Sequence, residues 1–178
     1  MTESQTAFEL LLDIDRRCRL LAADLPSQEA RLQRWSGIGF RLGPHWYVAP
    51  MGEVAEVLHE PRCTLMPGVK PWVRGVANLR GGLVGVVDLA GLLGSAVPRT
   101  EQALSEASLL AFNAALDVNA ALLVDRLAGL RGTDAFVSSE PPAEDSPSFF
   151  GTTYIDSSGT RWQELNLQIL SQHPAFLS

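Results

Sequence analysis

The chain is poor in lysine and in histidine. Among its 178 residues it has one lysine, Lys70, and three histidines, so that almost all of its positive charge is arginine. Its formal net charge is -6, and nowhere do lysine and arginine form a run. Recognition of nucleic acid depends on a local surplus of positive charge. The composition therefore argues against a nucleic-acid partner.

Cysteine and long apolar runs are scarce as well. The chain has two cysteines, Cys18 and Cys63, which is too few for a disulfide framework, and no other metal-ligating residues lie at suitable spacing from them. We therefore interpret both as half-buried free thiols in a reducing compartment. No apolar run reaches the length needed to span a membrane, and no export signal precedes the chain's first helical pattern. We expect a cytoplasmic protein without direct membrane insertion.

The sequence contains no recognisable catalytic motif. His45, His59 and His173 lie at predicted turns, and none has a cysteine, histidine or carboxylate at metal-binding spacing. Cys63 and His59 could be a nucleophile and its base, but no motif supplies a third orienting group. Neither a Walker-type phosphate loop nor a Gly-x-Ser-x-Gly elbow occurs. We expect no enzyme activity, no cofactor and no metal.

What the chain does contain begins with a helical pattern. Thr6 and Glu9 have the spacing of a capping box, and Pro26 ends or kinks the helix that follows. Between them an apolar stripe recurs at steps of three and four residues, namely Leu11, Ile14, Cys18, Leu21 and Leu25. A weaker helix is predicted over 28–34. Residues 1–35 are therefore predicted to be a helical extension, which we expect to pack onto its own domain rather than bind a partner.

From Trp35 onward the pattern changes to short strands. A hairpin is predicted over 38–42 and 46–48, around the turn at Gly43 and Pro44. Further strands are predicted over 54–58, 73–79, 83–87, 108–112, 120–127, 149–155 and 160–165, short helices over 88–93 and 167–172, and loops over 96–105 and 138–148. Many short strands with closely spaced turns favour barrels over a parallel sheet.

A weak internal echo suggests two similar halves. Asp88-Leu89 resembles Asn166-Leu167, and each pair opens a predicted short helix that would close one barrel. Asp88 is placed to cap the first of these helices, and Gly94 to end it.

The most concentrated signal surrounds Arg80. It stands before the glycine pair Gly81-Gly82, between two apolar strands, where its long charged side chain must reach solvent or a fixed acidic partner. Two interpretations stay open. Arg80 forms an internal ion pair with a carboxylate such as Glu56 or Asp125, or it contacts another protein.

Several motifs in order resemble the CheW-like family. The run Trp72 to Gly81 resembles the family's strand leading to Gly-Val-x-Asn-Leu-Arg-Gly, and Val84 to Leu89 resembles its Val-x-Asp-Leu segment. Val54 to Leu58, Thr64 to Pro67 and Ala121 to Leu127 fall where the family has its other motifs. The match covers about 37 to the C-terminus. The N-terminal extension is similar to that of CheW-like adaptors in type IV pilus chemosensory systems.

The resemblance implies a fold and a role. The fold is mainly β, with two intertwined five-stranded, SH3-like barrels over residues 36–178 and an apolar seam between them. The role is that of a non-catalytic adaptor, recruited to membrane-bound receptor arrays and active in twitching motility. Its implied partners are the regulatory CheW-like domain of a CheA-type histidine kinase and the cytoplasmic tip of a methyl-accepting chemoreceptor.

Carried over by position, the resemblance also implies partner-binding residues. Arg80 and Asn78 belong to the central motif, and Val54 and Glu56 to the strand that contacts partners. A different class of function remains open beside the adaptor, which is a sensor that binds a small molecule in the seam between the barrels.

Overall fold

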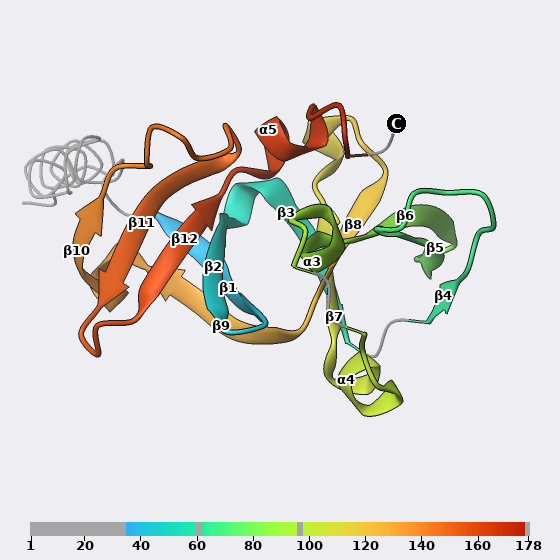
Figure 1. The fold of residues 1–178 in the computed structure, drawn as a ribbon, viewed down its shortest axis with the longest axis horizontal. Helices are drawn as coiled ribbons and strands as arrows, with labels where there is room; N and C mark the ends of the chain where they lie inside the picture. Colours follow the sequence, from blue (N-terminus) through green and yellow to red (C-terminus); the bar gives the residue numbers. More distant parts are fainter. Residues whose placement is uncertain (1–34, 60–61, 96–97, 177–178) are drawn as a thin grey trace, which may run out of the picture. The chain divides into compact units, whose positions relative to one another are not determined.

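Two six-stranded sheets make up the described part of the computed structural model, which comprises residues 35–59, 62–95, 98–176 (Figure 1). The first sheet has the order β10-β11-β12-β2-β1-β9, and the second the order β3-β7-β8-β6-β5-β4. The first contains β1 (Ser36–Leu42), β2 (His45–Pro50), β9 (Arg126–Gly132), β10 (Phe136–Glu140), β11 (Phe150–Asp156) and β12 (Arg161–Leu165). The second contains β3 (Val54–His59), β4 (Cys63–Thr64), β5 (Val73–Leu79), β6 (Gly82–Asp88), β7 (Ser108–Phe112) and β8 (Ala120–Val124).

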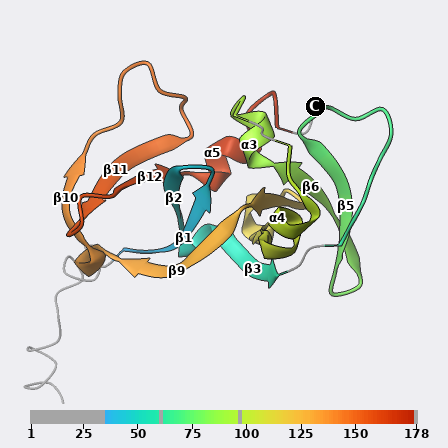
Figure 2. The same cartoon turned by 60° about the horizontal axis from the view of Figure 1, so that its bottom comes forward.

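The two sheets are interleaved along the chain. The chain starts the first sheet with β1 and β2, builds the whole second sheet, and then returns to complete the first with β9 to β12. Asp125 is the one residue between β8 and β9, so it marks the return crossing. Figure 2 shows β9 running along β1. The predicted class, mainly β with two intertwined barrel-like halves, is confirmed.

The apolar core consists of two clusters, of which one joins the two sheets and the other lies within the second sheet. On β1 the side chains of Ile38, Phe40 and Leu42 alternate with Gly37, Gly39 and Arg41, and the apolar set packs in one cluster with β7 and β8. Both β7 and β8 are buried along their whole length, as expected of strands covered on both faces. The cluster joins side chains of both sheets, among them Phe40, Tyr47, Leu110, Phe112 and Leu122. This shared core is the seam expected from the sequence.

Two short helices open in the same way. Before α3 (Leu89–Leu92), the Asp88 carboxylate accepts hydrogen bonds from the backbone N–H groups of the first turn, and Gly94 follows the helix with a φ of +72°. Before α5 (Leu167–Ser171), the Asn166 side chain accepts from the N–H of Ile169. The echo predicted from the sequence is therefore confirmed, with an asparagine as the capping residue of the second helix.

Three details of the prediction were wrong. Part of the loop predicted over 96–105 is a helix, α4 (Glu101–Glu106), which Thr100 caps by accepting from the N–H of Ala103. The strand predicted over 120–127 is two strands, because the chain changes sheets at Asp125. The loop predicted from residue 138 begins inside β10. Each sheet has six strands, where the resemblance implied five-stranded barrels. One of the six strands in the second sheet, β4, is only two residues long.

The predicted extension over residues 1–35 falls, but for its last residue, outside the described residues, and Cys18 lies there with it. Among the described residues, no helix is long and apolar enough to cross a membrane. Short 3-10 turns at Met51–Glu53, Ala114–Leu116 and Thr133–Ala135 complete the connections.

Candidate functional site

Arg80 sits at the tip of the β5–β6 hairpin. Leu79 pairs with Gly82, so Arg80 and Gly81 form a two-residue loop with φ values of +49° and +86°. Positive φ at both positions is what a type I′ hairpin turn requires, and glycine adopts it without strain. The Asn78 side chain accepts a hydrogen bond from the N–H of Gly81, at 3.0 Å. The turn is thus held by Asn78 while the guanidinium projects from the strand ends.

Arg80 has an internal partner but remains at the surface. Its Nε lies 2.8 Å from Oε2 of Glu56, and the Arg80 side chain is 79% exposed. Glu56 is on β3, which three other strands separate from β5 in the order of the sheet. The ion pair therefore joins distant strands and requires the second sheet to curl. Of the two carboxylates considered from the sequence, Glu56 is the one that pairs with Arg80.

The other two predicted contact residues differ in exposure. Asn78 is exposed, whereas Val54 is only 8% exposed and belongs to the core between the sheets. Val54 thus supports β3 from the core side while Glu56 faces the surface. Sequence reasoning missed Leu83, which is directly opposite Asn78 in the β5–β6 register and 62% exposed. Arginine is enriched at protein interfaces, and the exposed leucine adds apolar area beside it. We call Glu56, Asn78, Arg80 and Leu83 the hairpin surface.

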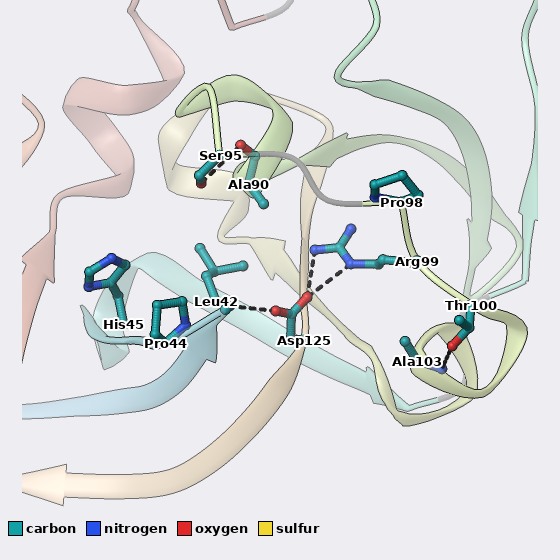
Figure 3. Close-up of a pocket in the computed structure, with 11 residues that line it drawn as sticks. Leu42, Pro44, His45, Ala90, Ser95, Pro98, Arg99, Thr100, Ala103 and Asp125 are labelled. Atoms are coloured by element: carbon teal, nitrogen blue, oxygen red, sulfur yellow. Dashed lines mark hydrogen bonds and ion pairs between the residues drawn. The ribbon is translucent and has the colours of Figure 1, made fainter.

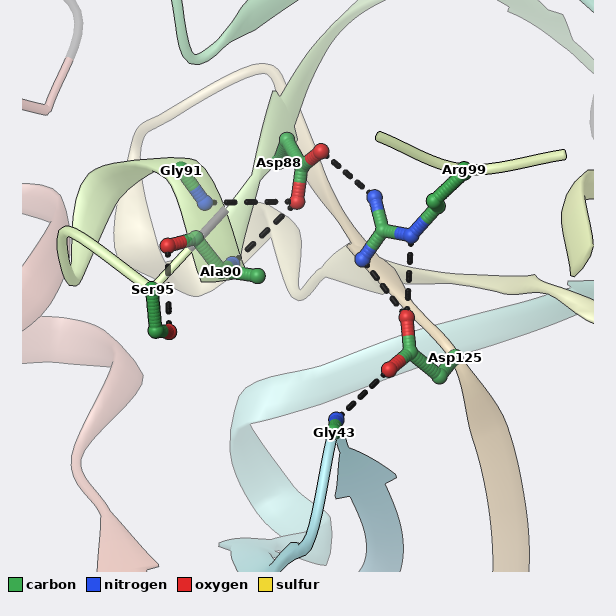
Figure 4. Close-up of polar contacts among 7 residues, drawn as sticks. All are labelled: Gly43, Asp88, Ala90, Gly91, Ser95, Arg99 and Asp125. Carbon is green, nitrogen blue, oxygen red and sulfur yellow. Dashed lines mark hydrogen bonds and ion pairs between the residues drawn. The ribbon is translucent and has the colours of Figure 1, made fainter. Parts of the chain in front are cut away.

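A second arginine, Arg99, is enclosed between two aspartates (Figure 4). Its Nη1 donates to Oδ2 of Asp88 at 2.5 Å, while its Nε and Nη2 both donate to Oδ1 of Asp125, at 2.9 and 2.7 Å. The remaining oxygen of Asp125 accepts from the N–H of Gly43 at 2.6 Å. Asp88 belongs to the second sheet and Gly43 to the β1–β2 turn of the first. Arg99 therefore closes a chain of charged hydrogen bonds that runs from one sheet to the other.

The two aspartates favour the charged form of Arg99. Burial by itself would lower the pKa of Arg99, but the hydrogen bonds and charges of Asp88 and Asp125 outweigh burial and leave that pKa raised. The side chain of Arg99 is 9% exposed. Nothing in the local sequence indicated this group, because Arg99 follows Pro98 in a segment without periodicity and its two partners are 11 and 26 residues away.

A pocket of about 500 Å³ opens beside this network (Figure 3). It is lined by the β1–β2 turn, α3, α4 and Arg99 with Asp125. Its size suits a small molecule. Its charged side chains, however, are already bonded to each other, and Thr100 caps α4. A sensor site needs polar groups that converge on a ligand, so the sensor alternative gains no support from this pocket.

A second pocket, of about 410 Å³, has lining residues from both sheets. It is lined by His59 of β3 and Ser108 of β7 on one side, and by Arg126 and Leu127 of β9 on the other, with Glu106 of α4. Because its walls come from both sheets, its width depends on how the two sheets are held. We call it the seam groove.

Cys63, His59 and His173 were weighed for catalysis, and each has its own surroundings in the structure. Burial raises the pKa of the Cys63 thiol, although the charge of Arg74 partly opposes this, so the thiol is a poor nucleophile at neutral pH. His59 contacts the hydroxyl of Ser108, and the ring of His173 packs edge-on against Phe149. Within the described ranges, no three histidine, cysteine or acidic side chains are grouped so that they could hold a metal ion.

The fold and the hairpin motif define the class of protein. The family model described as a CheW-like domain matches residues 36–174, and the chain belongs to this family. A curated relative, protein PilI of Pseudomonas aeruginosa strain PAO1, is 45% identical over 181 residues, which cover 99% of this chain and 98% of PilI. The crystal structure of the scaffolding protein TtCheW from Thermoanaerobacter tengcongensis superimposes with a TM-score of 0.62 at 19% identity, covering 76% of this chain and 92% of that one. The latter similarity concerns the fold alone.

Proposed function

We propose that this protein is a non-catalytic chemosensory adaptor that couples a methyl-accepting chemoreceptor to a CheA-type histidine kinase and thereby controls type IV pilus twitching motility. The observation that carries the proposal is the 45% identity to PilI along nearly the whole of both chains. The adaptor acts in the cytoplasm and reaches receptor arrays at the membrane through its partners.

The architecture is consistent with binding rather than catalysis. The charged groups at the pocket beside Arg99 are bonded to one another, and burial raises the pKa of the Cys63 thiol. A β-scaffold with buried apolar cores presents its loops and strand ends at fixed positions, which suits an adaptor. The proposed partners are the regulatory CheW-like domain of the kinase and the cytoplasmic tip of the receptor.

The hairpin surface is the proposed contact with one of these partners. Arg80 and Asn78 are exposed at its tip, and Glu56 fixes the direction of the guanidinium. Leu83 adds apolar area beside them. In such an arrangement the apolar area supplies most of the affinity while the arginine sets register and specificity. Val54 contributes from the core by holding β3 in place.

Binding assays with purified components test the proposal. The wild-type chain is titrated with the kinase regulatory domain and, separately, with a soluble receptor fragment, by calorimetry. We expect both to bind, and Arg80→Ala to weaken one of them by about tenfold or more, as truncation of a central interface arginine does.

Arg161→Ala is the matched control. Arg161 is also an exposed arginine paired with a carboxylate, Glu140, but it lies on the first sheet. We expect this variant to bind both partners as the wild type does. Loss of folding in Arg80→Ala would favour a purely internal ion pair at Arg80, and a well-folded wild type that binds neither partner would refute the adaptor role.

A further inference from the structure

We infer that one face of the first sheet binds an acidic peptide segment of another protein, with Arg41 of β1 and Arg131 of β9 as the groups that hold its carboxylates. The hairpin surface is on the second sheet, so this site is additional to the contact proposed above. Its test needs neither of the proposed partners.

The two arginines lie on the same face of the sheet. Along β1, Gly37, Gly39 and Arg41 alternate with the side chains that pack in the shared core, so they belong to the other face. Arg131 pairs with Gly37, and residues directly opposite each other in an antiparallel pair share a face. A Cβ at Gly39 would lie 3.2 Å from Cγ of Arg131, so the stem of Arg131 passes close to Gly39.

A tryptophan ring supports each guanidinium. Cζ of Arg41 is 5.9 Å from the ring centre of Trp46, which is on β2. Cζ of Arg131 is 4.8 Å from the ring centre of Trp162, which is on β12. The two ring centres are 5.0 Å apart, and a Cβ at Gly39 would be 2.8 Å from the Trp162 ring, so the glycine makes room for it. A guanidinium stacked on an aromatic ring keeps the edges of its planar fork for hydrogen bonds.

The positive charge of this pair is not compensated inside the protein. Among the described residues, the arginines that form ion pairs are Arg80, Arg99 and Arg161. In both Arg41 and Arg131, Nε is enclosed and has no hydrogen-bond acceptor. Both side chains are only partly buried, so their terminal nitrogens are left to contact a ligand. Two arginines without a carboxylate are a local surplus of positive charge in a chain whose net charge is -6.

Two acidic side chains of the same sheet are engaged elsewhere. Asp156, at the end of β11, accepts from the ring N–H of Trp162 and from the hydroxyl of Ser158. Glu164 of β12 accepts from the backbone N–H of Thr152. Neither carboxylate forms an ion pair with the two arginines, so the site is left for a carboxylate from outside.

A peptide suits the surroundings of the site better than a free anion does. A carboxylate matches the parallel donors of a guanidinium. From Trp162 a row of partly buried rings continues through Phe136 and Tyr154 to Trp35, with centres 6.2, 5.0 and 5.1 Å apart. These rings offer apolar contact to the rest of a peptide, whereas a free anion would leave them uncovered. Nucleic acid is disfavoured by the negative charge of the chain.

The first measurement follows the Nε–H signals of Arg41 and Arg131 in nitrogen-edited NMR spectra of the whole chain. Both groups are enclosed, so their exchange with water is slowed and the signals report on the site directly. We expect a capped hexaglutamate peptide to shift both signals to saturation, and a capped hexaglutamine peptide to shift neither. Hexaglutamate that leaves both signals in place would overturn the inference.

The second measurement compares the affinity of variants for hexaglutamate by calorimetry. Arg41→Gln and Arg131→Gln should each weaken binding by about tenfold, as loss of a hydrogen bond to a charged group does. Arg161→Gln is the control, because Arg161 directly precedes Trp162 on β12 and so lies on the opposite face. Arg131→Lys keeps the charge without the fork and should bind more weakly than the wild type, which covers the case in which a glutamine variant does not fold. Equal weakening in Arg161→Gln would indicate unspecific attraction and refute the site.

Other ligands separate the remaining explanations. Inorganic phosphate that shifts the two Nε–H signals at the same concentration as hexaglutamate would identify a site for small oxyanions and overturn the peptide assignment. A thymidylate octamer that binds more tightly than hexaglutamate would overturn it in favour of nucleic acid. None of these titrations contains the kinase or the receptor, so a negative result here leaves the proposed adaptor function standing.

Discussion

Arg99 and Arg80 each bind a carboxylate on another strand or segment, but in opposite surroundings. Arg99 is 9% exposed and uses three nitrogen atoms on two aspartates, whereas Arg80 is 79% exposed and meets one glutamate through Nε. Removing one member of a buried ion pair leaves an uncompensated charge, while an exposed pair contributes little to stability. We therefore expect the same chemistry to stabilise the fold at Arg99, whereas at Arg80 it leaves the guanidinium at the surface.

The largest effect should follow from removing the buried arginine. Arg99→Met leaves Asp88 and Asp125 facing each other without a cation, so we expect the free energy of unfolding to fall by about 3–5 kcal/mol. Urea unfolding followed by tryptophan fluorescence measures it. Arg161→Met, at an exposed pair, should lower it by less than about 1 kcal/mol. Equal losses in the two variants would contradict the comparison.

A backbone change beneath the hairpin surface should come next. A Cβ at Gly75, where φ is +134°, would lie 1.9 Å from the carbonyl oxygen of Thr64, so Gly75→Ala must displace β4 from β5. We expect a loss of about 2–3 kcal/mol in the free energy of unfolding. Gly52→Ala, where a Cβ meets nothing within 4 Å, should be near neutral. If Gly75→Ala lowers the free energy of unfolding more than Arg80→Ala does, backbone packing contributes more than the Arg80 ion pair to holding the hairpin in place.

An effect of intermediate size on stability is expected at Asp156, whose carboxylate accepts hydrogen bonds without being enclosed. Hydrogen bonds from Ser158 and from the ring N–H of Trp162 lower the pKa of Asp156 to about 2, from its ordinary value of 3.8. Because the folded-state pKa is the lower one, the stabilisation is present above pH 4 and is lost as the pH falls from about 4 to about 2. Asp156→Asn should flatten this part of the stability curve.

Urea midpoints between pH 5 and pH 2 measure the effect. Asp145→Asn, at an exposed position in the loop between β10 and β11, is the control and should leave the slope unchanged. An Asp156→Asn variant that keeps the wild-type acid dependence would show that other carboxylates determine it.

The smallest effect on stability is expected at the hairpin surface itself. Arg80→Ala removes an exposed ion pair, so the free energy of unfolding should change by less than about 1 kcal/mol. Thermal and urea unfolding of this variant, measured beside Glu56→Gln, give the comparison. A loss as large as that of Arg99→Met would show that the exposure of Arg80 is a poor guide to its role.

Local signals in the sequence predicted much of the fold. The alternation and glycine placement around Arg80 located β5, β6 and their turn, and Asp88 and Asn166 were correctly assigned to helix openings. These features depend on neighbours a few residues away, which is the range over which capping and strand alternation act. The ion pair of Arg80 with Glu56 was also among the alternatives, beside a pair with Asp125.

Features set by distant contacts escaped prediction. Strand β9 continues an apolar run that looked like the end of one strand, and the change of sheet at Asp125 is determined by contacts with Arg41, Gly43 and Arg99. Helix α4 is six residues long, too short for a periodic signal. The Arg99 network was not foreseen, because Asp88 and Asp125 lie in two separate motifs, Arg99 lies in neither, and the three side chains meet only in the folded chain.

The interleaved path has a consequence for how the protein folds. The second sheet is built from one continuous stretch, whereas β1 must wait for β9, whose Gly132 pairs with Ser36. Closing so long a loop costs entropy before the pairing is formed, which slows folding. During synthesis we expect the second sheet to form first, while the β1–β2 hairpin stays without its neighbours until the last third of the chain has emerged. In that interval the unpaired edges of β1 and β2 are the part of the molecule most exposed to wrong pairing.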